Sequence, residues 1–132
     1  MTPHSPFNAF AAALLALGLA ASGSALAQVK RTAVLTADVA APGREAVVVR
    51  GEIDPGASAP RHTHPGDEIS YVMEGEVELL IDGEAPRVVK AGEGFVIPAG
   101  KVHGARNSSG APVRFVGVYV LDKGKPLATP AK

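Results

Sequence analysis

Three histidines and one glutamate carry the most specific chemical signal in this sequence. His62 and His64 are separated by one residue, Glu68 follows four residues later, and His103 lies further along the chain. Residues i and i+2 of a β-strand project from the same face, so an extended segment places His62 and His64 side by side. Imidazole nitrogens and a carboxylate are ligands of borderline divalent metals such as Fe, Mn, Co, Ni, Cu or Zn. The pattern favours a metal site over an exposed, tag-like histidine pair. His103 contributes to this site only if the fold places it next to His62 and His64.

The elements that must position these side chains are short strands separated by turns. Clusters that form turns, such as Asp54-Pro55-Gly56 and Asp82-Gly83, divide a valine-rich chain. The expected strands cover residues 45–53, 68–74, 76–82, 86–90, 94–98, 102–107 and 112–121. Regular short strands with frequent turns predict an all-β sandwich or barrel.

Two spaced motifs run through this region. The first consists of Gly56, His62, His64, Glu68 and Gly75. The second consists of Gly92, Pro98, Gly100, His103 and Asn107. In order and spacing the chain resembles the cupin superfamily, and its small single-domain members in particular. The resemblance implies a single small jelly-roll β-barrel of the double-stranded β-helix type, with one divalent transition metal bound by His62, His64, Glu68 and His103.

Several fixed motif positions have a structural explanation. Gly56 and Gly75 fall at turns where a positive φ or a missing Cβ helps. Pro98 ends a strand and presets the turn that leads to His103. Asn107 is expected to brace the following turn, and we favour this role over its reading as a glycosylation acceptor.

Four protein ligands on a six-coordinate ion leave two neighbouring positions open, which suits a catalytic or binding site rather than a closed structural one. Glu68 is the one ligand that could also loosen and accept a proton. Tyr71 and Tyr119 are the other plausible proton donors, and the chain has no cysteine nucleophile. The first hypothesis is an oxidoreductase similar to the cupin dioxygenases, acting on a small, largely apolar or aromatic oxygen-bearing molecule. The second is a non-catalytic module that binds or senses a small ligand through its metal.

Composition narrows the function classes further. The chain has 132 residues, with 13 Lys and Arg against 13 Asp and Glu, so its formal net charge is zero. This balance argues against a nucleic-acid partner and against a polybasic membrane-surface protein. Without cysteine the domain has no disulfide, and its stability depends on packing, assembly or a bound ligand.

The first 27 residues contain no Lys, Arg, Asp or Glu. An apolar run over Ala9–Ala20, too short to span a bilayer, is followed by the small-x-small sequence Ala25-Leu26-Ala27. We interpret residues 1–27 as a signal peptide cut after Ala27, which predicts a periplasmic or secreted protein without a stable membrane anchor. The alternatives are a buried N-terminal helix and an uncleaved anchor.

The remaining chain is expected to form one domain. Residues 28–121 make up the predicted barrel, and residues 122–132 form a polar, loose tail interrupted by prolines. Residues 29–39 lack the alternation of a barrel strand, and small cupins, which this chain resembles, commonly dimerise through such N-terminal strands. We therefore expect a homodimer with 29–39 at its interface, against the alternative of a monomer whose N-terminal strand covers its own barrel edge.

Overall fold

The computed structural model describes residues 27–132, so the predicted signal peptide, except Ala27, lies outside the described residues. The described part forms ten strands and no helix, which confirms the predicted all-β class. No helix in this part of the chain is therefore long and apolar enough to cross a membrane.

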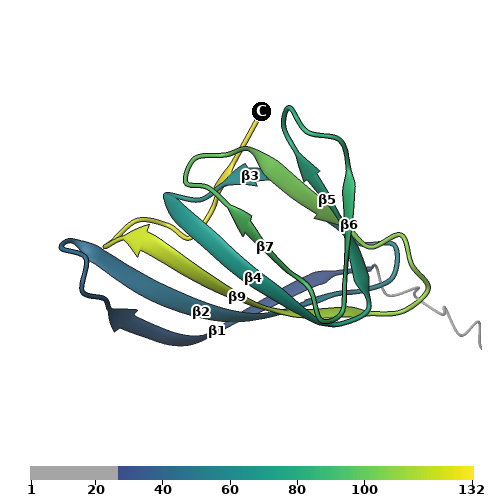
Figure 1. Ribbon diagram of the computed structural model, residues 1–132, viewed down its shortest axis with the longest axis horizontal. Coiled ribbons are helices and arrows are strands. Elements are labelled where there is room, and N and C mark those ends of the chain that lie inside the picture. Colours follow the sequence, from purple (N-terminus) through teal and green to yellow (C-terminus); the bar gives the residue numbers. More distant parts are fainter. Residues whose placement is uncertain (1–26) are drawn as a thin grey trace, which may run out of the picture.

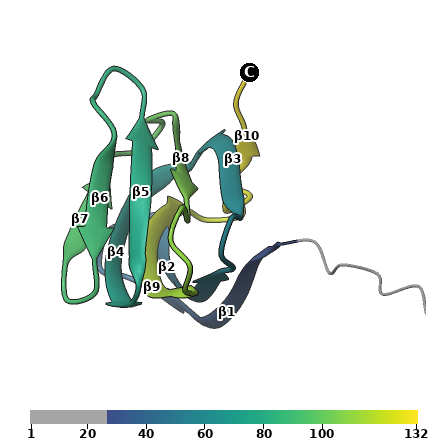
Figure 2. The ribbon, with the colours of Figure 1, turned by 90° about the vertical axis from the view of Figure 1, so that its right-hand side faces the viewer.

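The strands form two five-stranded antiparallel sheets that face each other as a jelly roll (Figures 1 and 2). The first sheet has the spatial order β1 (Val29–Asp38), β2 (Arg44–Ile53), β9 (Val113–Asp122), β4 (Gly66–Glu74) and β7 (Gly94–Ile97). The second has the order β10 (Thr129–Pro130), β3 (Ser58–Thr63), β8 (His103–Arg106), β5 (Glu76–Ile81) and β6 (Arg87–Lys90). Every strand predicted from the sequence is present with bounds that agree within two residues, and β1, β3 and β10 are additional.

The core lies between the two sheets. Several strands alternate buried and exposed residues, and the buried residues are on the face that points toward the other sheet. Along β4, Glu68, Ser70 and Val72 point inward, whereas Ile69 and Tyr71 point outward. The largest buried cluster joins apolar side chains of both sheets, namely Ile53, Ala57, Val72, Val77, Leu79, Val89, Val113 and Phe115. This cluster fills one end of the interior and leaves the other end to the histidines.

Two motif residues have the structural roles expected of them. Gly75 has a φ of 77°, and a Cβ at this position would lie 2.6 Å from the carbonyl oxygen of Pro112. Asn107 is fully buried, and its amide donates hydrogen bonds of 2.9 and 2.8 Å to the carbonyl oxygens of Ile53 and Ala111. Asn107 therefore holds the loop before β9 against the end of β2.

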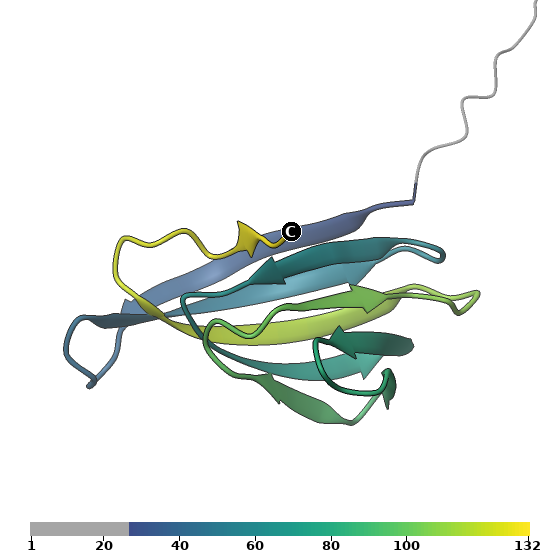
Figure 3. The same ribbon diagram turned by 90° about the horizontal axis from the view of Figure 1, so that it is seen from above.

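The C-terminal segment is not the loose tail that the sequence suggested. Its last part runs back over the molecule (Figure 3), where Thr129 and Pro130 pair with Thr63 and His62 of β3. Leu127 packs against a second buried cluster, formed by Val49, Tyr119 and Leu121. The polar sequence did not reveal these contacts, because β10 has only two residues and pairs with β3 through backbone groups that carry no residue-type signal.

The outer face of the first sheet carries an apolar row that crosses all five strands. Cross-strand pairing places its members next to one another in the order Leu35, Val48, Val118, Ile69 and Val96. Leu35, Ile69 and Val96 are each about half exposed. Ion pairs border the row on both sides: Lys30, Glu52, Arg114 and Glu74 form one series, and Arg44 pairs with Asp122 on the other side.

Candidate metal centre

His62 and His103 are brought together by strand pairing in the second sheet. His62 near the end of β3 lies directly opposite His103, the first residue of β8. A register shift between Ala59 and His62 precedes this pair. The two ring centroids are 4.3 Å apart. From the sequence, His103 was expected to contribute only if the fold places it beside His62 and His64. The pairing of β3 with β8 places it there.

His64 lies one residue beyond β3, in the link that crosses to β4 of the other sheet. Its carbonyl oxygen accepts a hydrogen bond of 2.9 Å from the backbone N–H of Gly100, in the turn that precedes β8. Its ring centroid is 4.8 Å from that of His62 and 5.0 Å from that of His103. The turn between β7 and β8 therefore fixes His64 as well as leading to His103.

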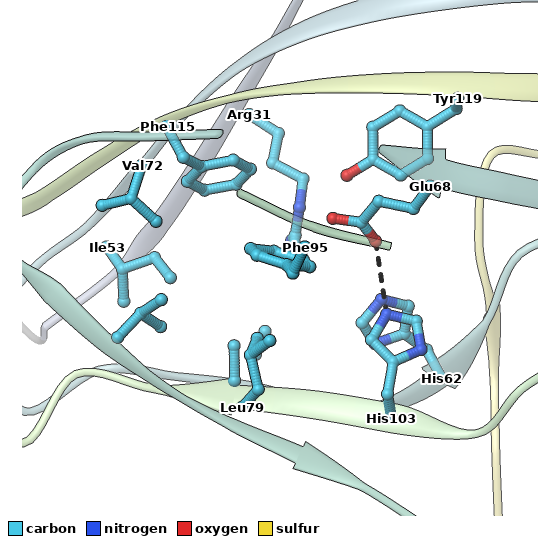
Figure 4. Close-up of a pocket in the computed structure, with 13 residues that line it drawn as sticks. Arg31, Ile53, His62, Glu68, Val72, Leu79, Phe95, His103, Phe115 and Tyr119 are labelled. Atoms are coloured by element: carbon cyan, nitrogen blue, oxygen red, sulfur yellow. Dashed lines mark ion pairs between the residues drawn. The ribbon is translucent and has the colours of Figure 1, made fainter. Parts of the chain in front are cut away.

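Glu68 reaches the histidines from the opposite sheet. Its Oε2 atom lies 3.0 Å from Nε2 of His64. It also lies 3.4 Å from Nε2 of His103, and a dashed line marks this contact in Figure 4. The hydroxyl of Ser70 donates a hydrogen bond of 2.7 Å to the other carboxylate oxygen, Oε1. The structure thus brings together all four predicted side chains, three from the side of the second sheet and one from the first.

Backbone carbonyl groups fix the orientation of all three imidazole rings. The Nδ1 atoms of His62, His64 and His103 lie 2.7, 2.6 and 2.9 Å from the carbonyl oxygens of Pro60, Leu127 and Lys101. Because a carbonyl oxygen only accepts, each Nδ1 must carry the proton and donate it. A neutral ring held in this way presents the lone pair of Nε2, which is the usual arrangement of histidines that bind a metal.

The Nε2 atom of His64 provides a direct test of whether a cation fits here. It is buried and has no hydrogen-bond partner among the described residues. With its proton on Nδ1, the lone pair of Nε2 faces a carboxylate oxygen only 3.0 Å away. Two lone pairs at this distance repel each other unless a positive charge lies between them. The donor atoms of the three histidines lie within 4.8 Å of one another. The donor set therefore fits a divalent metal ion.

The surroundings favour the protonation states that a metal requires. Burial raises the pKa of Glu68, but its close contacts with His103 and His64 and the hydrogen bond from Ser70 together outweigh burial and hold the pKa well below its ordinary value. Burial also lowers the pKa of His62, as do the charges of the neighbouring histidines. Glu68 is thus held as a charged carboxylate, and the neutral form of His62 is favoured.

A cavity of about 30 Å³ adjoins His62, Glu68 and His103. This exceeds the roughly 10–15 Å³ that one bound water needs. Its remaining wall is apolar apart from Tyr119 and Arg31, and includes Ile53, Val72, Leu79, Phe95 and Phe115 (Figure 4). The cavity thus has room for at least one water-sized group beside the histidines, and apolar side chains form most of its wall.

The two tyrosines considered from the sequence lie in different places. Tyr71 is about half exposed on the outer face of β4 and does not line the cavity. Tyr119 is buried, pairs with Glu68 across β4 and β9, and its ring centroid is 4.8 Å from that of His64. Burial and the charge of Glu68 raise the pKa of Tyr119, so its phenol keeps its proton at neutral pH.

Two groups at this site were not predicted from the sequence. Arg31 of β1 lines the cavity, and the carbonyl group of Leu127 orients His64. No pattern pointed to Arg31, because β1 lacks the alternation that shows which side chains face inward. A backbone carbonyl has no residue-type signal at all.

The two-sheet fold and the three-histidine group define a cupin, and comparison with known families agrees. The cupin domain model matches residues 49–119, more than half of the chain, and the protein therefore belongs to the cupin superfamily. This match covers the region of both sequence motifs.

Solved structures and curated proteins show the same relationship. A conserved protein with a double-stranded β-helix domain from Klebsiella pneumoniae has a TM-score of 0.63 and 30% identity, over 80% of this chain and 86% of that chain. Oxalate oxidase 1 of Hordeum vulgare is 34% identical over 124 residues, which cover 75% of this chain and 62% of that protein. An oxalate oxidase solved with the substrate analogue glycolate has a TM-score of 0.56 and 33% identity, over 64% of this chain and 45% of that one. The chain thus spans less than two thirds of the length of these oxalate oxidases.

Proposed function

We propose that this protein binds one divalent transition metal through His62, His64, Glu68 and His103 and acts as an oxidoreductase on a small oxygen-bearing molecule. The observation that carries the proposal is the convergence of three Nε2 lone pairs and one carboxylate, with Nε2 of His64 otherwise unpartnered among the described residues. An ion bound in a site of this kind polarises an oxygen ligand or activates dioxygen.

The chain's own residues supply orientation, proton handling and exclusion of water. The Nδ1 hydrogen bonds hold the rings in place, and Ser70 does the same for Glu68. Tyr119, which keeps its proton, is the group that could donate one beside Glu68, and Glu68 could accept one. The apolar wall helps to bury Glu68 away from bulk water and strengthens these electrostatic interactions.

The relatives support oxidation of a small molecule but do not identify it. Oxalate oxidases are among the similar proteins, and one of them has been solved with glycolate. A second function, non-catalytic binding of a small ligand, is favoured by a different observation. Apart from Arg31, Tyr119 and the proposed ligands, the described residues that line the cavity are all apolar, so a catalytic base separate from the metal is lacking.

Natively purified protein separates these two functions. The enzymatic proposal predicts Fe, Mn, Ni or Cu in the protein and consumption of dioxygen with small oxygen-bearing compounds. It also predicts that Tyr119→Phe lowers the rate by about tenfold or more, whereas Tyr71→Phe on the outer face leaves it unchanged. Zinc, no dioxygen consumption and a retained small ligand would instead support the binding function.

We also propose that the protein is exported after cleavage behind Ala27, on the basis of the apolar run and small-x-small sequence described above. The expected N-terminal residue of the protein recovered from its native host is Gln28. Intact-mass analysis tests this, and a folded protein that retains residues 1–27 would contradict it.

We further propose that the protein is a homodimer, with a second copy of the chain covering the outer face of the first sheet. The apolar row ends on β1 at Leu35, and β1 is exposed along nearly its whole length as the edge strand. An apolar centre bordered by ion pairs has the composition of a protein–protein interface. A long exposed edge strand also needs cover against unwanted pairing. Residues 29–39 would then contribute to the interface.

A further inference from the structure

Arg31 is the cation that lines the cavity beside the proposed metal ligands. It lies on β1 opposite Gly51 of β2, and its side chain extends inward between Phe115 and the pair formed by Glu68 and Tyr119 (Figure 4). A Cβ at position 51 would lie 2.1 Å from the Phe115 ring, so glycine is required there for the ring to occupy its place. The inner face of β1 and β2 is thereby shaped around an aromatic ring and a guanidinium group.

The charge of Arg31 is not satisfied by any carboxylate in the part of the chain that the structure describes. Ion pairs in this part engage Arg44, Arg61, Arg106 and Arg114, and Glu68 pairs only with histidines. Arg31 remains exposed, which keeps the cost of an unpaired charge small. The guanidinium group contacts the hydroxyl of Tyr119. Its other donors face no carboxylate of the described residues and are available to bind an anion at the edge of the cavity.

Arg31 also lines a second, outer cavity. This groove of about 360 Å³ lies between β1, β3 and the C-terminal segment, and Arg31 and His62 are the residues common to both cavities. Its other walls include His64, Pro60, Leu127 and Ala131. A guanidinium group common to the outer groove and the inner cavity lies where it can contact a molecule at the histidines from either side.

We propose that Arg31 is the specificity-determining residue of the site and that the small molecule bound there is a carboxylate with an apolar body. The inference rests on the proposed function, because it places this molecule beside the proposed metal ligands. Guanidinium groups match the two oxygens of a carboxylate with paired hydrogen bonds. The apolar wall opposite, which includes Val72, Leu79 and Phe95, accommodates the hydrocarbon part.

The competing explanation is that Arg31 only packs against the Phe115 ring, without a ligand. The two explanations differ in what they predict for charged and neutral molecules of one shape. The probes are propanoate and propanamide, titrated into zinc-loaded protein, with the NMR signal of the Arg31 Nε–H group as the readout. Arg31→Gln identifies that signal, and Arg50→Gln is the matched control because Arg50 is also exposed and has no ion pair within residues 27–132, but points outward.

Propanoate is expected to shift the Arg31 signal and to bind at least about tenfold more tightly than propanamide. Arg31→Gln is expected to weaken the binding of propanoate by about tenfold and to leave the binding of propanamide unchanged. Arg50→Gln is expected to change the binding of neither molecule. Propanoate binding that stays within twofold in Arg31→Gln, or an absence of propanoate binding, overturns the inference. Zinc content is measured first on every sample. A wild type that holds neither zinc nor any other divalent transition metal contradicts the proposed function, and the same titration then decides the role of Arg31 in the metal-free protein.

Discussion

The Nδ1 atom of His64 donates a hydrogen bond of 2.6 Å to the carbonyl oxygen of Leu127, although the two residues are 63 positions apart in the chain. This bond sets which nitrogen of His64 carries the proton. It therefore links the C-terminal segment to the orientation of Nε2, the proposed metal ligand of His64. Partners of this kind orient metal ligands without touching the metal.

Removing the C-terminal segment is expected to weaken metal binding more than it weakens the fold. A chain that ends at Lys125 lacks Leu127 and β10, so the His64 ring loses its acceptor and can rotate. We expect metal affinity to fall by about 10–100-fold, measured by competition with a chelator, while circular dichroism still shows a folded β-protein. A chain that lacks only Ala131 and Lys132 is the control. Equal affinities for the two shortened chains would show that Leu127 does not orient His64.

Ser70→Ala tests the support of Glu68 from the other side. The buried hydroxyl donates to Oε1 of Glu68, and its loss leaves a charged oxygen without that bond. We expect the free energy of unfolding of the metal-free protein to decrease by about 1–3 kcal/mol, with weaker metal binding as well. Ser58→Ala, at an exposed position of β3, is the matched control. Chemical denaturation provides the measurement, and an unchanged midpoint for Ser70→Ala would mean that this hydrogen bond does not stabilise the site.

Two exposed valines allow a paired test of the proposed dimer. Val96 belongs to the apolar row on the first sheet, whereas Val88 lies on β6 of the second sheet and has a similar exposure. Lysine in the row would place a charge in an apolar interface, so Val96→Lys is expected to give monomers and Val88→Lys is not. Light scattering of the protein without residues 1–27 at micromolar concentration measures this. A wild-type mass of one subunit, unchanged on tenfold concentration, would rule the dimer out.

The strands that the sequence predicted differ physically from those that it did not. β4 and β9 have one buried and one exposed face, so their residues alternate and reveal the strand. β1 is exposed on both faces along most of its length, which removes the need for alternation. Pro60 interrupts the sequence of β3, and β10 is too short to have a pattern. The strands that the sequence did not predict are therefore those in which few positions must be apolar to be buried.

The site shows the same division. His62, His64, Glu68 and His103 were predicted because imidazole and carboxylate groups at this spacing match a known family, and the structure brings them together. The Leu127 carbonyl could not be predicted, since any residue at that position provides one. Arg31 lies on the strand that lacked a pattern. Knowledge of the ligands thus came from side-chain chemistry, whereas knowledge of what orients and surrounds them required the fold.

Metal content of the wild type and of His64→Ala tests the central claim most directly. Thr63→Ala is the control, because Thr63 is the neighbouring residue and is not a proposed ligand. The account predicts about one divalent ion per chain in the wild type and in Thr63→Ala, and almost none in His64→Ala, with all three proteins folded by circular dichroism. Indistinguishable metal contents of the wild type and His64→Ala would contradict the assignment of the metal site.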